Sequence, residues 1–186
     1  MGVKLWMLRH ARVELAPGIC YGCSDVPAHA EHTESCARAA ALQLPKLLPV
    51  WVSGLRRAKQ MADVLHRLRP DLGEPRTDTR LNEMDFGLFE LQAWDSIPRA
   101  ALDAWTADFA HHLFGGAEST QMVIDRVAHA LDDLRSSDVT QTLWITHAGV
   151  IRAVHFLRTH GARPIENTGQ WPLEAPAPGA LICLDL

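Results

Sequence analysis

Short apolar runs alternate with stretches of helical periodicity along this chain. The runs at residues 4–8, 50–53, 142–146 and 180–184 are short enough for buried strands. Between them, residues 56–68 place five apolar side chains on one helical face: Ala58, Met61, Ala62, Leu65 and Leu68. Because strands alternate with helices, we expect a largely parallel sheet covered on both faces. The predicted fold class is α/β, a three-layer α/β/α sandwich with a mostly parallel central sheet.

The other expected elements follow from weaker periodicity and from turn-forming residues. We expect helices over residues 31–48, 93–109, 120–134 and 149–158, a further short strand over 75–77 and a loop over 164–179. The first helix should end at Pro45 or in the leucine pair that follows, and Pro98 should break the second. Ser119 or Thr120 is the expected cap of the third. At 186 residues without an internal repeat, the chain is most simply one domain, residues 1–186.

Two of the expected strands end in a histidine. The first runs into Arg9 and His10, and the strand at 142–146 runs into His147 and Gly149. In an open α/β sheet, ligands gather where the strands deliver side chains at their carboxyl ends. An arginine beside a histidine offers a fixed cation next to a nitrogen that can be a nucleophile at neutral pH. The repetition of this pattern predicts one shared site.

Composition and charge exclude several classes of function. Hydrophobic residues make up 47% and charged residues 22%, and the net charge of −4 gives no global basic surface for nucleic acid or acidic membranes. No apolar run approaches the roughly 20 residues that span a bilayer. The first strand begins at Lys4 and leaves no room for a signal peptide, so we expect a cytoplasmic protein. The four cysteines are then expected to be reduced thiols.

A zinc site has to be weighed in the turn-rich loop at residues 17–27. Cys20-x-x-Cys23 lies there, with three further possible ligands nearby: His29, His32 and Cys36. The spacing matches no familiar zinc finger, and the chain holds only one Cys-x-x-Cys. We therefore expect no metal.

Four separated segments, in order, resemble the histidine phosphatase superfamily, which has the phosphoglycerate-mutase-like fold. Residues 9–11 are similar to its Arg-His-Gly signature, and residues 53–62 to Ser-Pro-Leu-x-Arg-Ala-x-Gln-Thr-Ala. Residues 81–90 are similar to Leu-x-Glu-x-x-Phe-Gly-x-x-Glu, and residues 146–152 to Thr-His-Gly-Gly-x-x-Arg. Residues 115–119 with Arg126-Val127 resemble a further Gly-Glu-Ser and Arg-Val segment.

Within the superfamily, the loops resemble the alpha-ribazole phosphatase branch, which dephosphorylates a nucleotide-loop intermediate of cobalamin synthesis. The similar stretches are residues 17–27 and 83–87, with Trp94-Asp95 and Trp105 after them. The resemblance implies a phosphomonoesterase acting on a small phosphate ester such as alpha-ribazole 5′-phosphate. A broad-specificity phosphatase is the alternative. A weakly active phosphate-binding protein is another, because Ala11 stands where the family has glycine.

The resemblance also assigns roles to residues. It implies that His10 attacks phosphorus to give a phosphohistidine, without metal or organic cofactor. Arg9 and Arg57 would hold the phosphoryl oxygens, with His147 as a further donor and Ala148 beside it in the substrate site. Glu83 would protonate the leaving alkoxide and then activate water. We expect the protein to be a monomer or a homodimer.

Several residues near these motifs carry competing interpretations. Arg56 adjoins Arg57, and only the motif register selects Arg57. Asp85 and Glu90 are plausible acids, but we expect them to cap loops or pair with arginines. Trp171 is expected to pack in the core rather than line the site. Where the family has other residues, this chain has Ala16, Gly54, Leu91 and Ala148.

Overall fold

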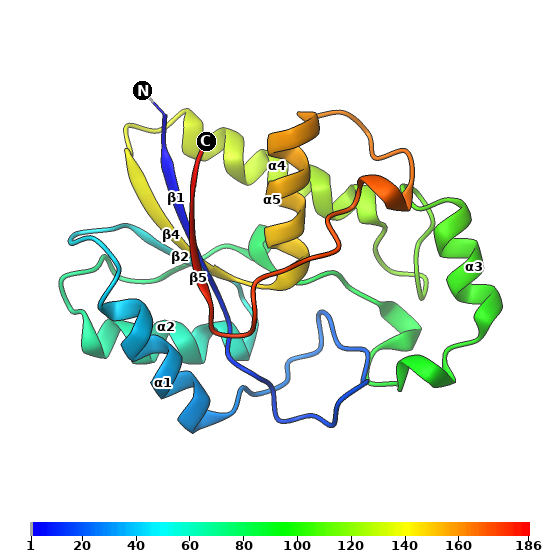
Figure 1. Cartoon of the computed structure of the whole chain (residues 1–186), viewed down its shortest axis with the longest axis horizontal. Coiled ribbons are helices and arrows are strands. Elements are labelled where there is room, and N and C mark those ends of the chain that lie inside the picture. The colour runs from blue at the N-terminus through cyan, green and yellow to red at the C-terminus, as the bar shows by residue number, and fades with distance from the viewer. Residues whose placement is uncertain (1) are drawn as a thin grey trace.

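The computed structural model describes residues 2–186 and is organised around a five-stranded sheet (Figure 1). Its strands lie in the order β3-β2-β4-β1-β5. β1, β4, β2 and β3 run parallel, whereas β5 pairs antiparallel with β1. Their bounds are β1 Lys4–Arg9, β2 Val50–Val52, β3 Arg76–Thr77, β4 Gln141–Thr146 and β5 Leu181–Asp185. The predicted α/β fold with a mostly parallel sheet is confirmed.

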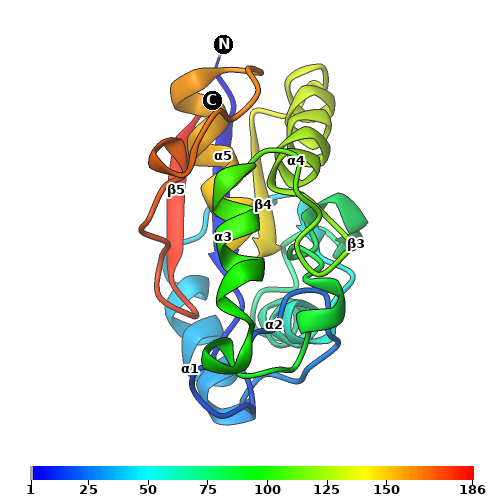
Figure 2. The same ribbon diagram turned by 90° about the vertical axis from the view of Figure 1, so that its right-hand side faces the viewer.

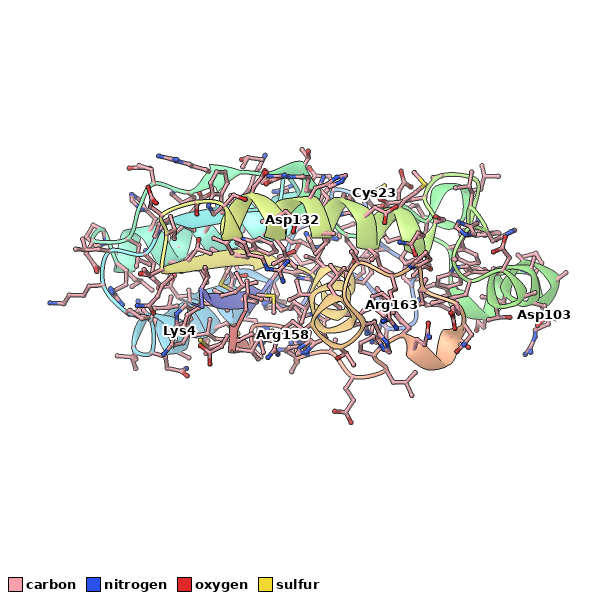
Figure 3. The ribbon with its side chains drawn as sticks, turned by 90° about the horizontal axis from the view of Figure 1, so that it is seen from above. Lys4, Cys23, Asp103, Asp132, Arg158 and Arg163 are labelled. Carbon is pink, nitrogen blue, oxygen red and sulfur yellow. The ribbon has the colours of Figure 1, made fainter. Side chains whose placement is uncertain are left out.

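Helices cover both faces of the sheet. α1 (Ala30–Ala41) and α2 (Arg56–Leu68) lie on one face, and α4 (Thr120–Arg135) and α5 (Ala148–His160) on the other (Figure 1). α3 (Arg99–Ala107) lies apart from the sheet, at the right of Figure 1 and in front of the strands in Figure 2. Seen from above, Asp103 on α3 and Lys4 on β1 lie at opposite ends of the molecule (Figure 3). Residues 2–186 also contain four short 3-10 helices: η1 Thr79–Leu81, η2 Gly87–Phe89, η3 Trp94–Ser96 and η4 Thr168–Gln170.

The alternation of side chains along β4 separates the core into two clusters. Leu143 and Ile145 pack with α1 and α2, whereas Trp144 packs with α4 and α5. All three are buried, as expected for a central strand covered on both faces. The period of two along this strand therefore accounts for the two helical layers.

Prolines mark the limits of two helices, of which the first differs from expectation and the second is broken at Pro98 as predicted. α1 ends at Ala41, ahead of the predicted end at or beyond Pro45, because a proline disfavours helical geometry in the residue before it. The stretch 93–109 divides into η3 and α3, and Pro98 is the N-cap of α3. Proline fits there because the first helical residues need no intrahelical donor. α2 and the Ser119 cap of α4 match the sequence prediction.

No helix within residues 2–186 is long and apolar enough to cross a membrane.

Candidate active site

The carboxyl ends of β1 and β4 bring two histidines together. His10 follows β1 and His147 follows β4, and these strands are paired neighbours in the sheet. The ring centroids are 5.0 Å apart and the ring planes are tilted by 52°. Both side chains are buried, with 2% and 0% of their surface exposed. The shared position that the strand ends predicted is therefore present in the structure.

His10 presents a neutral ring whose second nitrogen is free to react. Its Nδ1 lies 2.6 Å from the carbonyl oxygen of Ala11, which can only accept, so the proton is on Nδ1. Nε2 then carries the lone pair. Burial lowers the pKa of His10 to about 3, helped by the positive charges of Arg57 and Arg9. At neutral pH the ring is uncharged, as a nucleophile must be.

Arg57, the second residue of α2, is completely buried, whereas its neighbour Arg56 is exposed. Its Nη1 donates to the carbonyl of Ser24 at 2.8 Å and its Nη2 to that of Gly22 at 2.5 Å. Only glycine fits at position 22, because a Cβ there would lie 1.8 Å from the carbonyl oxygen of Met84. Burial lowers the pKa of Arg57, while nearby carboxylates oppose that shift. The sequence distinguished Arg57 from Arg56 only by its position in the motif, whereas in the structure the two differ in burial.

Arg9 is half-buried and tied to the C-terminal segment. Its Nη1 donates to the carbonyl of Pro176 at 2.7 Å. Its Nε is buried and has no hydrogen-bond partner within residues 2–186. The positive charge of Arg9 contributes to the lowered pKa of His10. Arg9 is available to an anion through donors that the segment does not use.

Proton counting fixes the tautomer of His147. Ser53 Oγ lies 2.9 Å from Asn82 Oδ1, which has no proton to give, so the hydroxyl donates there. His147 Nε2, at 2.7 Å from the same hydroxyl, must then be the donor. Its Nδ1 is buried and has no partner in the described part of the chain. Burial and the charge of Arg57 lower the pKa of His147, so the ring is neutral.

Glu83 lies at the N-terminus of α5, close to His147. Its Oε1 and Oε2 accept from the backbone N–H of Gly149 at 3.1 and 3.0 Å, and Oε1 also accepts from that of Met84. A Cβ at Gly149 would lie 2.1 Å from Oε1, so only glycine admits the carboxylate at this distance. The first turn of a helix favours a negative charge. Glu83 also lies near enough for its charge to act on Arg57.

Asp85 and Glu90 cap loops, as expected. Asp85 accepts from the backbone N–H of Gly87 at 2.8 Å. Glu90 accepts from four backbone N–H groups, those of Gly22, Cys23, Ser24 and Phe86, and from the Ser24 hydroxyl. Burial raises the pKa of Glu90, but these hydrogen bonds hold it below its usual value. Its oxygens are therefore committed to holding the loop that carries the two carbonyl acceptors of Arg57.

The residues weighed for zinc do not assemble into one site. Within residues 2–186, the one cluster of three possible metal ligands is Cys23, Asp85 and Glu90. Burial raises the pKa of Cys23 to about 12, helped by a hydrogen bond with Asp85, so the thiol keeps its proton. Because Glu90 already accepts from five donor groups, this set of side chains fits a loop anchor better than a metal site.

The alanines at the positions of two family glycines cause no backbone strain. Within residues 2–186, the only non-glycine residues with positive φ are Leu47 and Leu91. Ala11 is fully buried in the core, and Ala148 is the first residue of α5, directly after His147. The turn that orients His10 therefore tolerates alanine. The positive φ falls at Leu91, the other position where the family has glycine.

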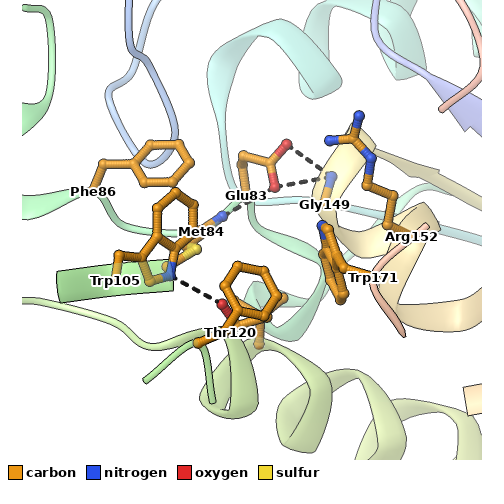
Figure 4. A pocket seen from close by; sticks show the side chains of 10 residues that line it. Glu83, Met84, Phe86, Trp105, Thr120, Gly149, Arg152 and Trp171 are labelled. Carbon is orange, nitrogen blue, oxygen red and sulfur yellow. Dashed lines mark hydrogen bonds between the residues drawn. The ribbon is translucent and has the colours of Figure 1, made fainter. Parts of the chain in front are cut away.

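A cavity of about 100 Å³ opens beside Glu83 (Figure 4). It is lined mainly by apolar and aromatic side chains from four separate parts of the chain: Met84, Phe86, Trp105, Phe109, Val123 and Trp171. Glu83, Thr120 and Arg152 are its polar side chains. Trp171 also packs against the core, so the expectation that it only packs was incomplete. Sequence reasoning gave no role to Ser53, Asn82 or Arg152, although all three lie inside the matched motifs.

The sequence profile of the histidine phosphatase superfamily (branch 1) matches residues 5–177. The chain belongs to this superfamily. No curated protein matches the chain. The superfamily assignment accounts for the strand-end histidines and for the arginine at the start of α2, which all lie within the matched residues.

Solved structures of the superfamily share the fold. A phosphoglycerate mutase from Thermus thermophilus is 27% identical with a TM-score of 0.70, covering 98% of this chain and 92% of that one. A mycobacterial glucosyl-3-phosphoglycerate phosphatase is 22% identical with a TM-score of 0.76, covering 98% and 90%. A protein described as mycobacterial hydrolase 2 is 23% identical with a TM-score of 0.78, covering 99% and 82%. None of these three is an alpha-ribazole phosphatase by name, so that branch stays a prediction.

Proposed function

We propose that this chain is a phosphomonoesterase that works through a phosphohistidine on His10. The observation that carries the proposal is the state of that ring: neutral, buried, with its Nδ1 proton held by the carbonyl of Ala11 and its Nε2 lone pair free. Arg57 and Arg9 supply positive charge beside it. Phosphoryl transfer needs an in-line nucleophile and positive charge around the equatorial oxygens, which this arrangement offers.

The proposed reaction has two steps. In the first, His10 Nε2 forms a bond to phosphorus while the ester oxygen leaves, taking a proton from Glu83. In the second, Glu83 takes a proton from water as the water oxygen attacks phosphorus and the P–Nε2 bond breaks. Arg9 and Arg57 bind the phosphoryl oxygens in both steps, and His147, beside Ala148, joins them as a donor when a bound anion brings a proton to its Nδ1. Over the two steps Glu83 gives one proton and takes one back, so no net proton is gained or lost by this carboxyl group.

The substrate class is a small phosphorylated metabolite. Alpha-ribazole 5′-phosphate is the candidate that the loop resemblance supports, and broad specificity for small esters is the alternative. In the second step a mutase transfers the phosphoryl group to an alcohol, whereas a phosphatase transfers it to water. The cytoplasmic location and the monomeric or homodimeric state remain predictions from the sequence.

The deciding experiment traps the intermediate. Wild type is mixed rapidly with p-nitrophenyl phosphate, quenched under denaturing conditions and digested, and the phosphorylated peptide is located by mass spectrometry. We expect acid-labile phosphate on the peptide that contains His10. His10→Ala should lose turnover and the trapped phosphate while still binding sulfate through the arginines. His111→Ala, a change at an exposed histidine, is the matched control and should behave as wild type.

Three further arms separate the alternatives. Turnover with and without a chelator tests for a metal requirement. A panel of phosphate esters that includes alpha-ribazole 5′-phosphate tests specificity, and release of inorganic phosphate in the presence of glycerate separates a phosphatase from a mutase. Anion binding without turnover by wild type would favour a phosphate-binding protein instead. Near-normal turnover by His10→Ala would exclude covalent catalysis at this residue.

A further inference from the structure

We infer that the cavity beside Glu83 binds the alcohol part of the substrate and that it selects a single aromatic ring joined directly to the ester oxygen or one bond from it. This rests on the proposed function, because it takes Glu83 as the proton donor to the leaving oxygen. Glu83 belongs to both regions: its charge acts on Arg57, and its side chain lines the cavity. The carbon skeleton of the leaving group must therefore start where the cavity starts.

The walls are aromatic and come from well-packed elements. Trp105 on α3 stacks on Phe114 with ring centroids 4.4 Å apart. Phe86 packs edge-on against Trp105, with centroids 6.3 Å apart. Phe109 lies 6.2 Å from Trp171 in an edge-on arrangement. Phe86 and Trp105 lie on one side of the cavity and Trp171 lies on the other (Figure 4). Faces and edges held this way suit another ring, because aromatic pairs prefer offset-stacked or edge-on contacts.

Several polar atoms of the cavity are committed to other partners, although the buried Nε of Arg152 has none within residues 2–186. Trp105 Nε1 donates to Thr120 Oγ1 at 3.2 Å, and Arg152 Nη2 donates to the carbonyl of Leu173 at 2.8 Å. Both Glu83 oxygens accept from Gly149. A leaving group rich in hydroxyls would lose its hydrogen bonds to water here and regain few. An apolar ring has no such cost.

The volume of the cavity limits the bound group to a single ring. The cavity measures about 100 Å³, less than the roughly 150 Å³ that holds benzene in an engineered protein. Because this cavity opens to solvent, a single ring can enter with part of its edge exposed. Arg152 lies at the wall, where its guanidinium can stack on the ring. A fused or strongly branched group would project into solvent and gain less, so this inference favours a small ester other than alpha-ribazole 5′-phosphate.

The test measures binding of phosphonates, which cannot be hydrolysed. Titration calorimetry on the intact chain compares methylphosphonate, benzylphosphonate and 2-carboxyethylphosphonate. We expect benzylphosphonate to bind about 10- to 50-fold more tightly than methylphosphonate, from burial of most of one ring. Trp171→Ala should reduce that preference about fivefold or more, and Trp171→Phe should restore most of it. Leu173→Ala, an exposed change in the same segment, should leave it unchanged.

The outcomes separate this inference from the proposed function. Equal binding of methylphosphonate and benzylphosphonate would overturn the inference, and so would tighter binding of the carboxylate compound or no binding of any phosphonate. If no phosphate ester is turned over but the Trp171-dependent preference is present, the proposed function fails and the cavity assignment stands. If wild type turns over many esters but binds benzylphosphonate no more tightly than methylphosphonate, the proposed function stands and the aromatic selectivity is excluded.

Discussion

The two sides of the candidate site are built in opposite ways. The phosphoryl side consists of His10, His147 and Arg57, which sit at strand ends or in the first turn of a helix and are buried. The leaving-group side consists of Glu83 and the aromatic cavity, whose walls come from the loop before η2, from the region of α3, from α4 and from residue 171. The first side lies at two strand ends and one helix start, whereas the second combines loop residues with residues of α3 and α4.

This difference implies a division of labour. The charges of the phosphoryl side meet a group that every phosphate ester shares, so they should act on all substrates alike. The leaving-group side meets the part in which substrates differ, and loops and single side chains can vary there without disturbing the sheet. Selectivity should therefore depend on the second side and the common chemical step on the first.

The largest expected effect tests Glu83 on the leaving-group side. An alkoxide leaving group needs a proton in the transition state, whereas p-nitrophenolate hardly does. Glu83→Gln should slow the first step with an alkyl phosphate by about 10²- to 10⁴-fold, and with p-nitrophenyl phosphate far less. Single-turnover measurements isolate that step, because dephosphorylation also uses this carboxylate.

The matched control for Glu83 is Asp85→Asn. Asp85 caps the turn at Gly87, so its loss should affect both substrates equally and weakly. If Glu83→Gln slows both substrates by the same factor in the first step, Glu83 is not the acid. Asp85 then becomes the next candidate, and the division between the two sides has to be redrawn.

The next effect tests the phosphoryl side through Arg57. Arg57→Gln should slow the first step by about 10²- to 10³-fold, the usual cost of losing one preorganised donor. The factor should be the same for alkyl and aryl phosphates, because Arg57 acts on oxygens that both share. Arg57→Lys keeps the charge but loses the forked geometry and should recover only part of the rate.

Because Arg57 is buried and hydrogen-bonded to Gly22 and Ser24, its variants need a check of folding by circular dichroism and thermal unfolding. Arg56→Gln is the control, since Arg56 is exposed on the same turn of α2. It should leave the rate within about twofold of wild type, the size of effect expected of an exposed charge. A strong dependence of the Arg57→Gln effect on the leaving group would break the proposed division.

The third effect concerns stability in acid and belongs to the phosphoryl side alone. The unfolded chain protonates His10 below pH 6.5, but the folded chain does so only near its lowered pKa of about 3. Between these values the unfolded state binds one more proton, so the free energy of unfolding falls as the pH falls. The slope is about 1.4 kcal/mol per pH unit for this histidine. The lowered pKa of His147 acts in the same direction.

Urea unfolding at pH 6, 5 and 4 measures this slope for wild type and His10→Asn. Carboxylates contribute alike to both proteins, so the difference between the curves isolates His10. We expect the stability of His10→Asn relative to wild type to improve by about 1.4 kcal/mol for each unit of acidification. His111→Asn should run parallel to wild type. Parallel curves for His10→Asn would mean that the ring is protonated in the folded state.

Sequence reasoning predicted the two sides to different degrees, for physical reasons. His10 and His147 end apolar runs, and the paired parallel strands carry those ends to one edge of the sheet. The ring orientation of His147 was not predictable, because it depends on Ser53 and Asn82, which meet only in three dimensions. The aromatic cavity was not predicted either. Trp105 and Trp171 are 66 residues apart in the chain, and periodicity carries no information on such loop contacts.

The smallest expected effect concerns the end of the loop that leads from Glu83 into the rest of the chain. Leu91 has a φ of 65°, a conformation that costs an L-residue roughly 1–2 kcal/mol. Its side chain is 55% exposed, so little burial is lost by removing it. Leu91→Gly should raise the free energy of unfolding by up to about 1 kcal/mol, once the entropy that glycine adds to the unfolded chain is subtracted, and raise the Tm by about 2–4 °C.

The control Leu91→Ala keeps the Cβ and should not be more stable than wild type. Leu47→Gly, at the other positive φ of the described chain, should gain similarly far from Glu83. Scanning calorimetry measures all three, and a lower Tm for Leu91→Gly would show that the leucine side chain stabilises this loop by more than its backbone conformation costs.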